Sequence, residues 1–267
     1  MKKFVRCLWL NQREFIRTRK NILSLLAIIS CCAFMILSTL LIPKMLDKAT
    51  GISSYLKNGE SASVITEKLF PQDMKGSCGV FASDIGLFYS LMVILTTYTL
   101  LPNEIKNGRI IPPICAGYSK AILLISKEVV YGLFFAIPVF CGYLLYYSIA
   151  GKFLIVNYPL REALQNAAAL SIAEFCIAAF SIVLSVINKQ PMMTFALMAS
   201  CVMIIPDALS YFQFARFFPT YLLTYTYNSS KDFCSFLWPV WISMLVLCLT
   251  NIFALRKRME ICYDSRR

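Results

Sequence analysis

The strongest constraint on the fold is a pair of long apolar runs, 79–101 and 129–150, that flank a short polar segment, 101–128. Each run is long enough to cross a hydrocarbon core as a helix, which takes about 20 apolar residues. The segment between them must therefore lie in water at one face of a membrane. It carries four Lys or Arg residues against two Glu residues, and Pro112 and Pro113 forbid one continuous helix through it. This pattern predicts an all-α integral membrane protein.

Composition supports the same class. Of the 267 residues, 58% are hydrophobic and 15% are charged, whereas a soluble domain carries about 25% charged residues. The net charge of +12 does not indicate nucleic-acid binding, because the basic residues gather at the ends of the apolar runs, as membrane topology requires. The size fits a single transmembrane domain, 1–267, without a second folded unit.

The residue types that build catalytic and metal sites are scarce. The chain has no histidine, which excludes histidine-based catalysis and histidine metal sites. It has eleven cysteines, many inside apolar runs where a thiol behaves as a small apolar side chain, and no C-x-x-C pair. Cys78 and Cys234 both fall near the predicted outer face and could pair, although unpaired thiols are favoured. No metal site is expected.

The first 21 residues predict an amphipathic helix that lies in the membrane interface. At 100° per residue, one helical face is apolar and the opposite face is charged. The apolar face holds Phe4, Val5, Leu8, Trp9, Phe15 and Ile16, and the charged face holds Arg6, Arg13, Glu14 and Arg17.

Six transmembrane spans are predicted after this helix. They are 22–42, 79–101, 129–150 (interrupted by Pro138), 163–187, 192–211 and 233–255. An even number places both termini on one side of the membrane, and seventeen of the 26 Lys and Arg residues lie on that side. The positive-inside rule therefore predicts a multi-pass protein of the cytoplasmic (plasma) membrane with both termini in the cytoplasm.

The sequence lacks the common motifs of nucleotide-binding proteins, zinc proteases and serine hydrolases. It contains no phosphate-binding loop of the type G-x-x-x-x-G-K-[ST], no H-E-x-x-H and no G-x-S-x-G. The chain is therefore not expected to be an enzyme or to hold a cofactor itself. Any energy source must be a partner chain or an ion gradient.

Residues of the polar segment follow a recognisable order: an acid, a polar–glycine pair, an apolar stretch, prolines, a small–basic motif and a lysine before the third span. They are Glu104, Asn107 and Gly108, 109–111, Pro112 and Pro113, 117–120, and Lys127; Gly108 and Gly117 mark the two ends. Together with the N-terminal amphipathic helix and the six spans, this order resembles the membrane (permease) subunit of type-2 ABC transporters, the ABC exporter family. The proline-plus-arginine phrase usual in that family is replaced here by AGYSK.

The resemblance implies that 102–128 is a cytoplasmic coupling loop that docks on a separate ABC ATPase subunit, which would hold the ATP and Mg²⁺. The charged contacts would come from Glu104, Lys106, Arg109 and Lys120, or these residues only set the topology. The resemblance also implies a second permease copy, identical to this chain or different from it, and contact of the permease with membrane lipid. The expected substrate is an exported amphipathic compound, such as an antimicrobial peptide or a drug.

Acidic residues inside the predicted spans form a second candidate set, Glu174, Asp84 and Asp207. Glu174 lies about eleven residues into its span, roughly 17 Å deep at 1.5 Å per residue. A charged carboxylate at that depth is costly unless a polar cavity or a cation stabilises it. Glu174 could line a translocation path or the dimer seam and favour cationic substrates. Alternatively, it is a neutral acid bonded to a neighbouring Ser or Thr.

Two other functions stay open. One is a gradient-driven carrier in which Glu174 is the proton site, and the other is a membrane assembly protein without transport activity. A membrane enzyme acting on lipid is disfavoured, because the sequence offers only scattered carboxylates.

Overall fold

The computed structural model describes residues 2–17, scattered positions between 22 and 37, and residues 73–154, 158–188, 190–203 and 233–257. Most of these residues are helical and none of them forms a β-strand, so the described part of the chain is all-α. The helices are α1 (Lys2–Arg17), α4 (Met74–Thr97), α5 (Leu100–Lys106), α6 (Ile111–Cys115), α7 (Lys120–Ala150), α8 (Leu160–Ile187), α9 (Pro191–Met203) and α12 (Phe233–Lys257).

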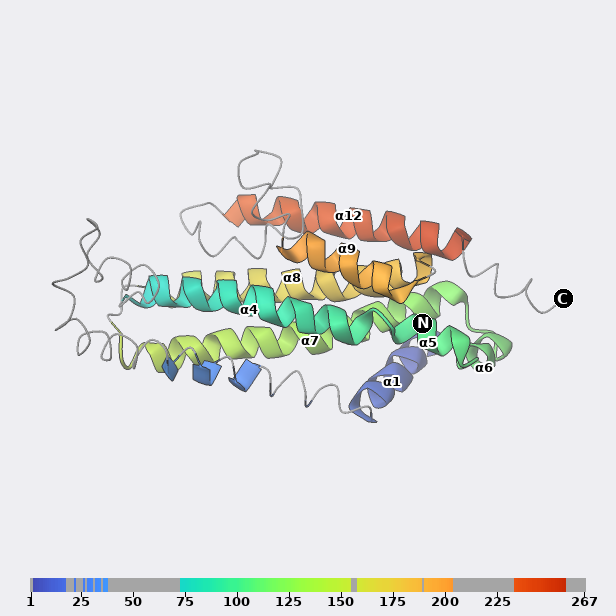
Figure 1. Ribbon diagram of the computed structural model, residues 1–267, viewed down its shortest axis with the longest axis horizontal. Coiled ribbons are helices and arrows are strands. Elements are labelled where there is room, and N and C mark those ends of the chain that lie inside the picture. The colour runs from blue at the N-terminus through green and yellow to red at the C-terminus, as the bar shows by residue number, and fades with distance from the viewer. Residues whose placement is uncertain are drawn as a thin grey trace, which may run out of the picture.

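Three long helices, α4, α7 and α8, form the centre of the bundle (Figure 1). α7 packs most extensively on α8, and α4 packs on both of them. α9 lies against α4 and α8, α12 lies against α8, and α1 crosses obliquely against α7. One end of the bundle gathers the α5–α6 segment, the turn between α8 and α9 and the C-terminal end of α12, with α1 close by (Figure 1).

Three helical segments are long and apolar enough to cross a membrane: Met74–Lys106, Lys120–Ala150 and Leu160–Ile187. They contain the predicted spans 79–101, 129–150 and 163–187. The protein is therefore built as a membrane-embedded helical bundle.

The other three predicted spans stay predictions. Residues 22–42 are described only at scattered positions, which are helical. The span 192–211 is described as far as Met203, and α12 has an apolar stretch, Val240–Ala254, that is shorter than a full span.

α7 is longer than the apolar run that predicted it. Its 31 residues make it about 46 Å long, whereas a hydrocarbon core is about 30 Å thick. It begins at Lys120 because the Ser119 hydroxyl caps it, accepting a hydrogen bond from the Ile122 N–H at 3.3 Å. Pro138 does not interrupt the helix, contrary to the sequence-based expectation. Packing of α7 on α4 and α8 holds the helix through this residue.

Small and aromatic side chains fill the interfaces between the central helices. The ring of Phe81 in α4 stacks on Tyr146 in α7 with centroids 4.0 Å apart, and the Tyr146 hydroxyl lies 2.5 Å from Ser77 Oγ. Gly132 of α7 lies directly against the ring of Phe175 in α8, where an added Cβ would meet a ring carbon at 2.5 Å. Small residues at such contacts let two membrane helices approach closely.

Replacing Gly132 by alanine should lower the free energy of unfolding by about 1–3 kcal/mol, the usual cost of overpacking, because the new methyl group meets the Phe175 ring. Gly79→Ala is the matched control, since nothing lies within 4 Å of its added Cβ. The control should gain up to about 1 kcal/mol from the helix propensity of alanine. Thermal unfolding in mild detergent measures both variants, and equal stabilities would contradict this packing.

Candidate functional site

A short helix, α6, lies at the end of the bundle between α5 and α7 (Figure 1). Pro112 and Pro113 occupy its first turn, where a missing N–H costs nothing. Gly108 and Gly117 lie on either side with φ of +69° and +78°, a left-handed conformation that glycine adopts without strain. The sequence thus breaks the helix before and after α6, as the two glycines predicted. None of the side chains of α6 is buried.

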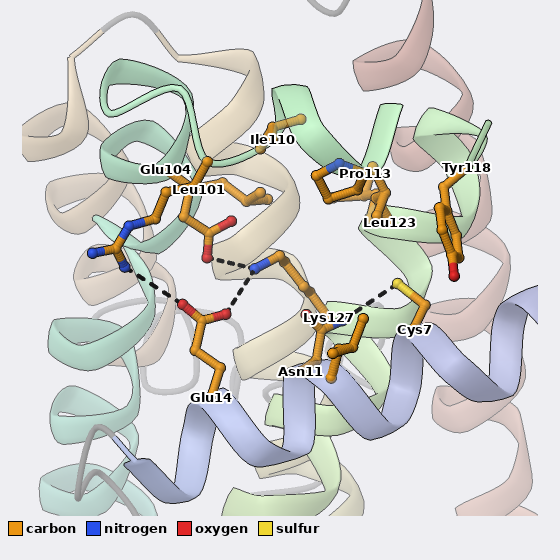
Figure 2. A pocket seen from close by; sticks show the side chains of 13 residues that line it. Cys7, Asn11, Glu14, Leu101, Glu104, Ile110, Pro113, Tyr118, Leu123 and Lys127 are labelled. Atoms are coloured by element: carbon orange, nitrogen blue, oxygen red, sulfur yellow. Dashed lines mark hydrogen bonds and ion pairs between the residues drawn. The ribbon is translucent and has the colours of Figure 1, made fainter. Parts of the chain in front are cut away.

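Four charged side chains meet beside α6 (Figure 2). Glu104 of α5 forms an ion pair with Lys127 of α7. Glu14 of α1 lies 3.9 Å from Lys127 Nζ and 3.6 Å from the Arg109 guanidinium. The side chains of Glu104 and Lys127 are buried, whereas that of Arg109 is 67% exposed. This charge network (Glu14, Glu104, Arg109 and Lys127) joins α1, α5 and α7 at one point.

α1 makes further contacts with the first turns of α7. Asn11 Nδ2 donates a hydrogen bond to Ser126 Oγ at 2.8 Å, and Cys7 Sγ lies 3.0 Å from the same oxygen. Deeper along α7, the ring of Phe15 stacks on Phe134 with centroids 4.5 Å apart. α1 is therefore held to α7 by polar contacts at one end and by aromatic packing at the other.

A cavity of about 240 Å³ lies at this junction, lined by residues of α1, α5, α7 and the segment around α6 (Figure 2). Its charged lining is the network of two acids and two bases. Because these charges balance, the cavity does not indicate a site for a small ion. It indicates a loosely filled junction between the N-terminal helix and the α6 segment.

The predicted coupling residues divide into two groups. Glu104 points into the bundle toward Lys127 and is 8% exposed (Figure 2). Lys106 and Arg109 are exposed, and Lys120 is half-buried. Glu104 is thus placed to hold the loop from inside, while Lys106 and Arg109 remain accessible. Contact of these residues with an ATPase stays a prediction.

Glu174 is fully buried and bonds to α4. Its Oε1 lies 2.7 Å from Ser90 Oγ, and the same hydroxyl also reaches the carbonyl oxygen of Gly86. A hydroxyl has one proton to donate, so when Ser90 donates to Gly86 the carboxyl group must donate to Ser90. Glu174 Oε2 has no hydrogen-bond partner among the described residues. This geometry agrees with a neutral glutamic acid bonded to serine.

The other two acids of that set differ in their placement. Asp84 is half-buried on α4, and Asp207 lies outside the described residues. A role for Glu174, Asp84 or Asp207 on a translocation path or a dimer seam stays a prediction.

A second polar pair repeats seven residues further along the α4–α8 seam. Thr97 Oγ1 lies 2.8 Å from Ser181 Oγ, just as Ser90 contacts Glu174. α4 and α8 run in the same direction, so seven residues advance both helices by about two turns and return the same faces to each other. This spacing is the sequence signal that could have located the seam.

The sequence did not reveal the ion pairs that Glu14 and Lys127 form in the charge network. It also did not reveal the hydrogen bond between Glu128 and Asn251. Asn251 of α12 donates a hydrogen bond to Glu128 Oε2 at 2.9 Å, and both side chains are buried. Lys127 and Glu128 are adjacent, so they point to different sides of α7, one toward α5 and the other toward α12. Two opposite charges at the start of an apolar run were a visible signal. Their partners lie far away in the sequence and were not visible.

The sequence left open a disulfide between Cys78 and Cys234 and predicted no metal site. Cys78 is a buried free thiol, and the side chain of Cys234 lies outside the described residues. Within the described ranges, no group of three or more acidic, Cys or His side chains could hold a metal ion.

No protein-family model matches this sequence, and no curated protein is significantly similar to it. The resemblance to ABC exporter permeases therefore depends on the sequence pattern alone: the order of residues in the segment 101–128, the predicted N-terminal amphipathic helix and the six predicted spans.

Lys127→Met should lower the free energy of unfolding by about 3–5 kcal/mol, because it leaves the Glu104 carboxylate buried without its cation. The double variant Glu104→Gln with Lys127→Met should lose less, since no unpaired charge remains. Lys106→Met is the matched control on the exposed side of the same loop and should change stability by no more than about 0.5 kcal/mol. Thermal unfolding in detergent measures all three, and a tolerated Lys127→Met would contradict the buried pair.

Glu174→Gln should leave the unfolding temperature close to that of the parent chain, because an amide can donate to Ser90 as a carboxylic acid does. Ser90→Ala should cost about 1–3 kcal/mol, since it leaves a buried polar group without its partner. Infrared spectroscopy provides the direct test. A carboxylic-acid C=O band that disappears in Glu174→Gln is expected, and its absence from the parent chain would contradict a neutral Glu174.

Proposed function

We propose that this chain is the permease subunit of an ATP-driven ABC exporter, powered by a separate ATPase subunit. The observation that carries the proposal is α6, a short exposed helix held at one end of a bundle of membrane-length helices. Ile111, Pro112 and Cys115 are exposed on it. Exposed apolar residues of this kind fit a protein partner. Lys106 and Arg109 beside them would complement an acidic surface of that partner.

The connection of α6 to the bundle through α5 supplies a route for mechanical coupling. α5 joins α6 directly to α4, and the ion pair of Glu104 and Lys127 joins α5 to α7. A displacement of α6 would therefore act on two membrane-length helices together. In the proposed cycle, ATP binding closes two ATPase copies, and their contacts with α6 shift two permease copies between inward-facing and outward-facing states.

The proposed cargo is an amphipathic compound, such as an antimicrobial peptide or a drug, moved across or out of the cytoplasmic membrane. In this proposal α6 and both termini face the cytoplasm. The end of the bundle that carries α6 also carries the exposed bases Arg6, Arg13, Lys106 and Arg109, which is the distribution that the positive-inside rule requires. ATP and Mg²⁺ belong to the partner subunit.

A gradient-driven carrier is the second candidate, and Glu174 favours it. This carboxyl group is fully buried, and one of its oxygens has no hydrogen-bond partner among the described residues. Ionisable residues at such depth commonly mark proton or substrate paths. Transport that follows a proton gradient, and that stops in Glu174→Gln without loss of expression, would favour this candidate.

A photo-crosslinking amino acid placed at Ile111 should capture a P-loop ATPase in intact cells, because that side chain is 41% exposed on α6. The same amino acid at Phe153 is the matched control, since Phe153 is 60% exposed and follows the C-terminal end of α7, which lies away from α6 (Figure 1). Mass spectrometry identifies the captured protein. Lys106→Glu should reduce the capture at Ile111, because it reverses an exposed charge without disturbing the buried pair.

Two results would contradict the proposal: crosslinks at Ile111 that contain no ATPase, or the same ATPase captured equally well from Phe153.

A further inference from the structure

α1 has three distinct faces, although its sequence predicted two. The face toward the bundle carries Cys7, Asn11 and Phe15, which are four residues apart and buried. This stripe is the one that contacts Ser126 and packs on Phe134. Some apolar residues of α1 therefore pack against the bundle, and others are exposed on its outer side.

A second, apolar face of α1 points away from the bundle. Val5, Trp9 and Ile16 lie on it and are 60%, 54% and 49% exposed. Beside it runs a third face of exposed bases, Arg6, Arg13 and Arg17. The guanidinium of Arg13 lies 5.6 Å from the centre of the Trp9 ring, so the border between the two faces is a cation–π contact.

α1 lies at the level where α7 leaves the hydrocarbon core. It contacts α7 from Ser126 to Phe134, around the start of the apolar run at residue 129. α7 exceeds the thickness of a hydrocarbon core by about ten residues, so its first turns extend into the headgroup region. The exposed apolar face of α1 is thus placed at the boundary of the acyl chains, and its bases at the level of the headgroups.

We infer that the outer face of α1 binds the headgroups of anionic phospholipids and that this binding fixes the position of the α6 segment. Charge complementarity selects the lipid, because three exposed arginines border an exposed apolar stripe and no acidic side chain lies on this face. The inference goes beyond ATPase docking, since it holds whether or not α6 binds an ATPase.

The link from lipid to α6 is direct, because α1 contacts the chain at both ends of α6. Lys3 Nζ donates a hydrogen bond to the carbonyl oxygen of Gly117, just after α6, at 3.0 Å. Glu14 pairs with Arg109, just before α6, at 3.6 Å. Gly108 and Gly117 are the two left-handed turns that set the direction of the chain into and out of α6, so α1 restrains the segment at its turns. Lipid that holds α1 in place therefore also restrains α6.

Hydrogen–deuterium exchange of the full chain in lipid nanodiscs tests the inference without an ATPase. The chain is compared in phosphatidylcholine alone and in phosphatidylcholine containing phosphatidylglycerol. The anionic lipid should slow amide exchange several-fold in peptides covering 2–17 and 108–118, and should leave peptides of α8 unchanged. Because the parent chain is the first sample, this test does not depend on a variant that folds.

Three sets of variants separate the binding of lipid by α1 from the transmission of its effect to the α6 segment. Arg6→Gln with Arg13→Gln and Arg17→Gln should abolish the lipid effect on both segments. Lys75, Lys152 and Arg161 are exposed bases at the start of α4, just after α7 and at the start of α8, which is the end of the bundle away from α6. Neutralising them removes the same charge and should preserve the effect on both segments. Lys3→Met with Glu14→Gln should preserve the effect on 2–17 and abolish it on 108–118.

Two outcomes would overturn the inference. Exchange in 2–17 that is the same in both lipids would show that α1 does not recognise anionic headgroups. A lipid effect on 108–118 that survives the loss of Lys3 and Glu14 would show that α1 does not transmit it.

Discussion

The packing of helices at the α6 end of the bundle depends on one buried ion pair, between Glu104 and Lys127. Each charge would be costly to bury alone, so the two side chains hold each other and the helices that carry them together. Glu14 extends this pair to Arg109 at the surface. As a result, the N-terminal helix, the α6 segment and the first turns of α7 form one connected unit. Small movements at α6 are therefore expected to reach the membrane-length helices.

Helix length explains why this unit lies where it does. Both α7 and the segment Met74–Lys106 are longer than a hydrocarbon core requires, so their ends project toward the headgroups. Charged residues are tolerated there because water and lipid headgroups are close. The same groups deeper in the bundle need internal partners, as Glu174 has in Ser90. Depth thus separates an accessible junction at α6 from an enclosed polar seam between α4 and α8.

The seam and the junction fit different parts of the proposed transport cycle. The junction offers exposed groups that a partner protein and a lipid surface can reach, and its cavity of about 240 Å³ leaves it loosely filled. The seam offers buried hydroxyl and carboxyl groups at seven-residue intervals, which favour one register between two parallel helices. Function at the seam would need the helices to separate or a second copy to contribute.

The sequence by itself determined the helical class, three membrane-length segments and the interruptions at Gly108 and Gly117, because apolar run length and backbone preference are local properties. It also marked Glu174 as unusual, since an acid inside an apolar run is costly, and it singled out Glu104 as a residue of the polar segment 101–128. Only the tertiary structure decided their partners, Ser90 and Lys127. It also decided that Cys7, Asn11 and Phe15 face the bundle while Trp9 does not. These outcomes depend on which helices pack together, and a one-dimensional hydrophobic pattern contains no information about that choice.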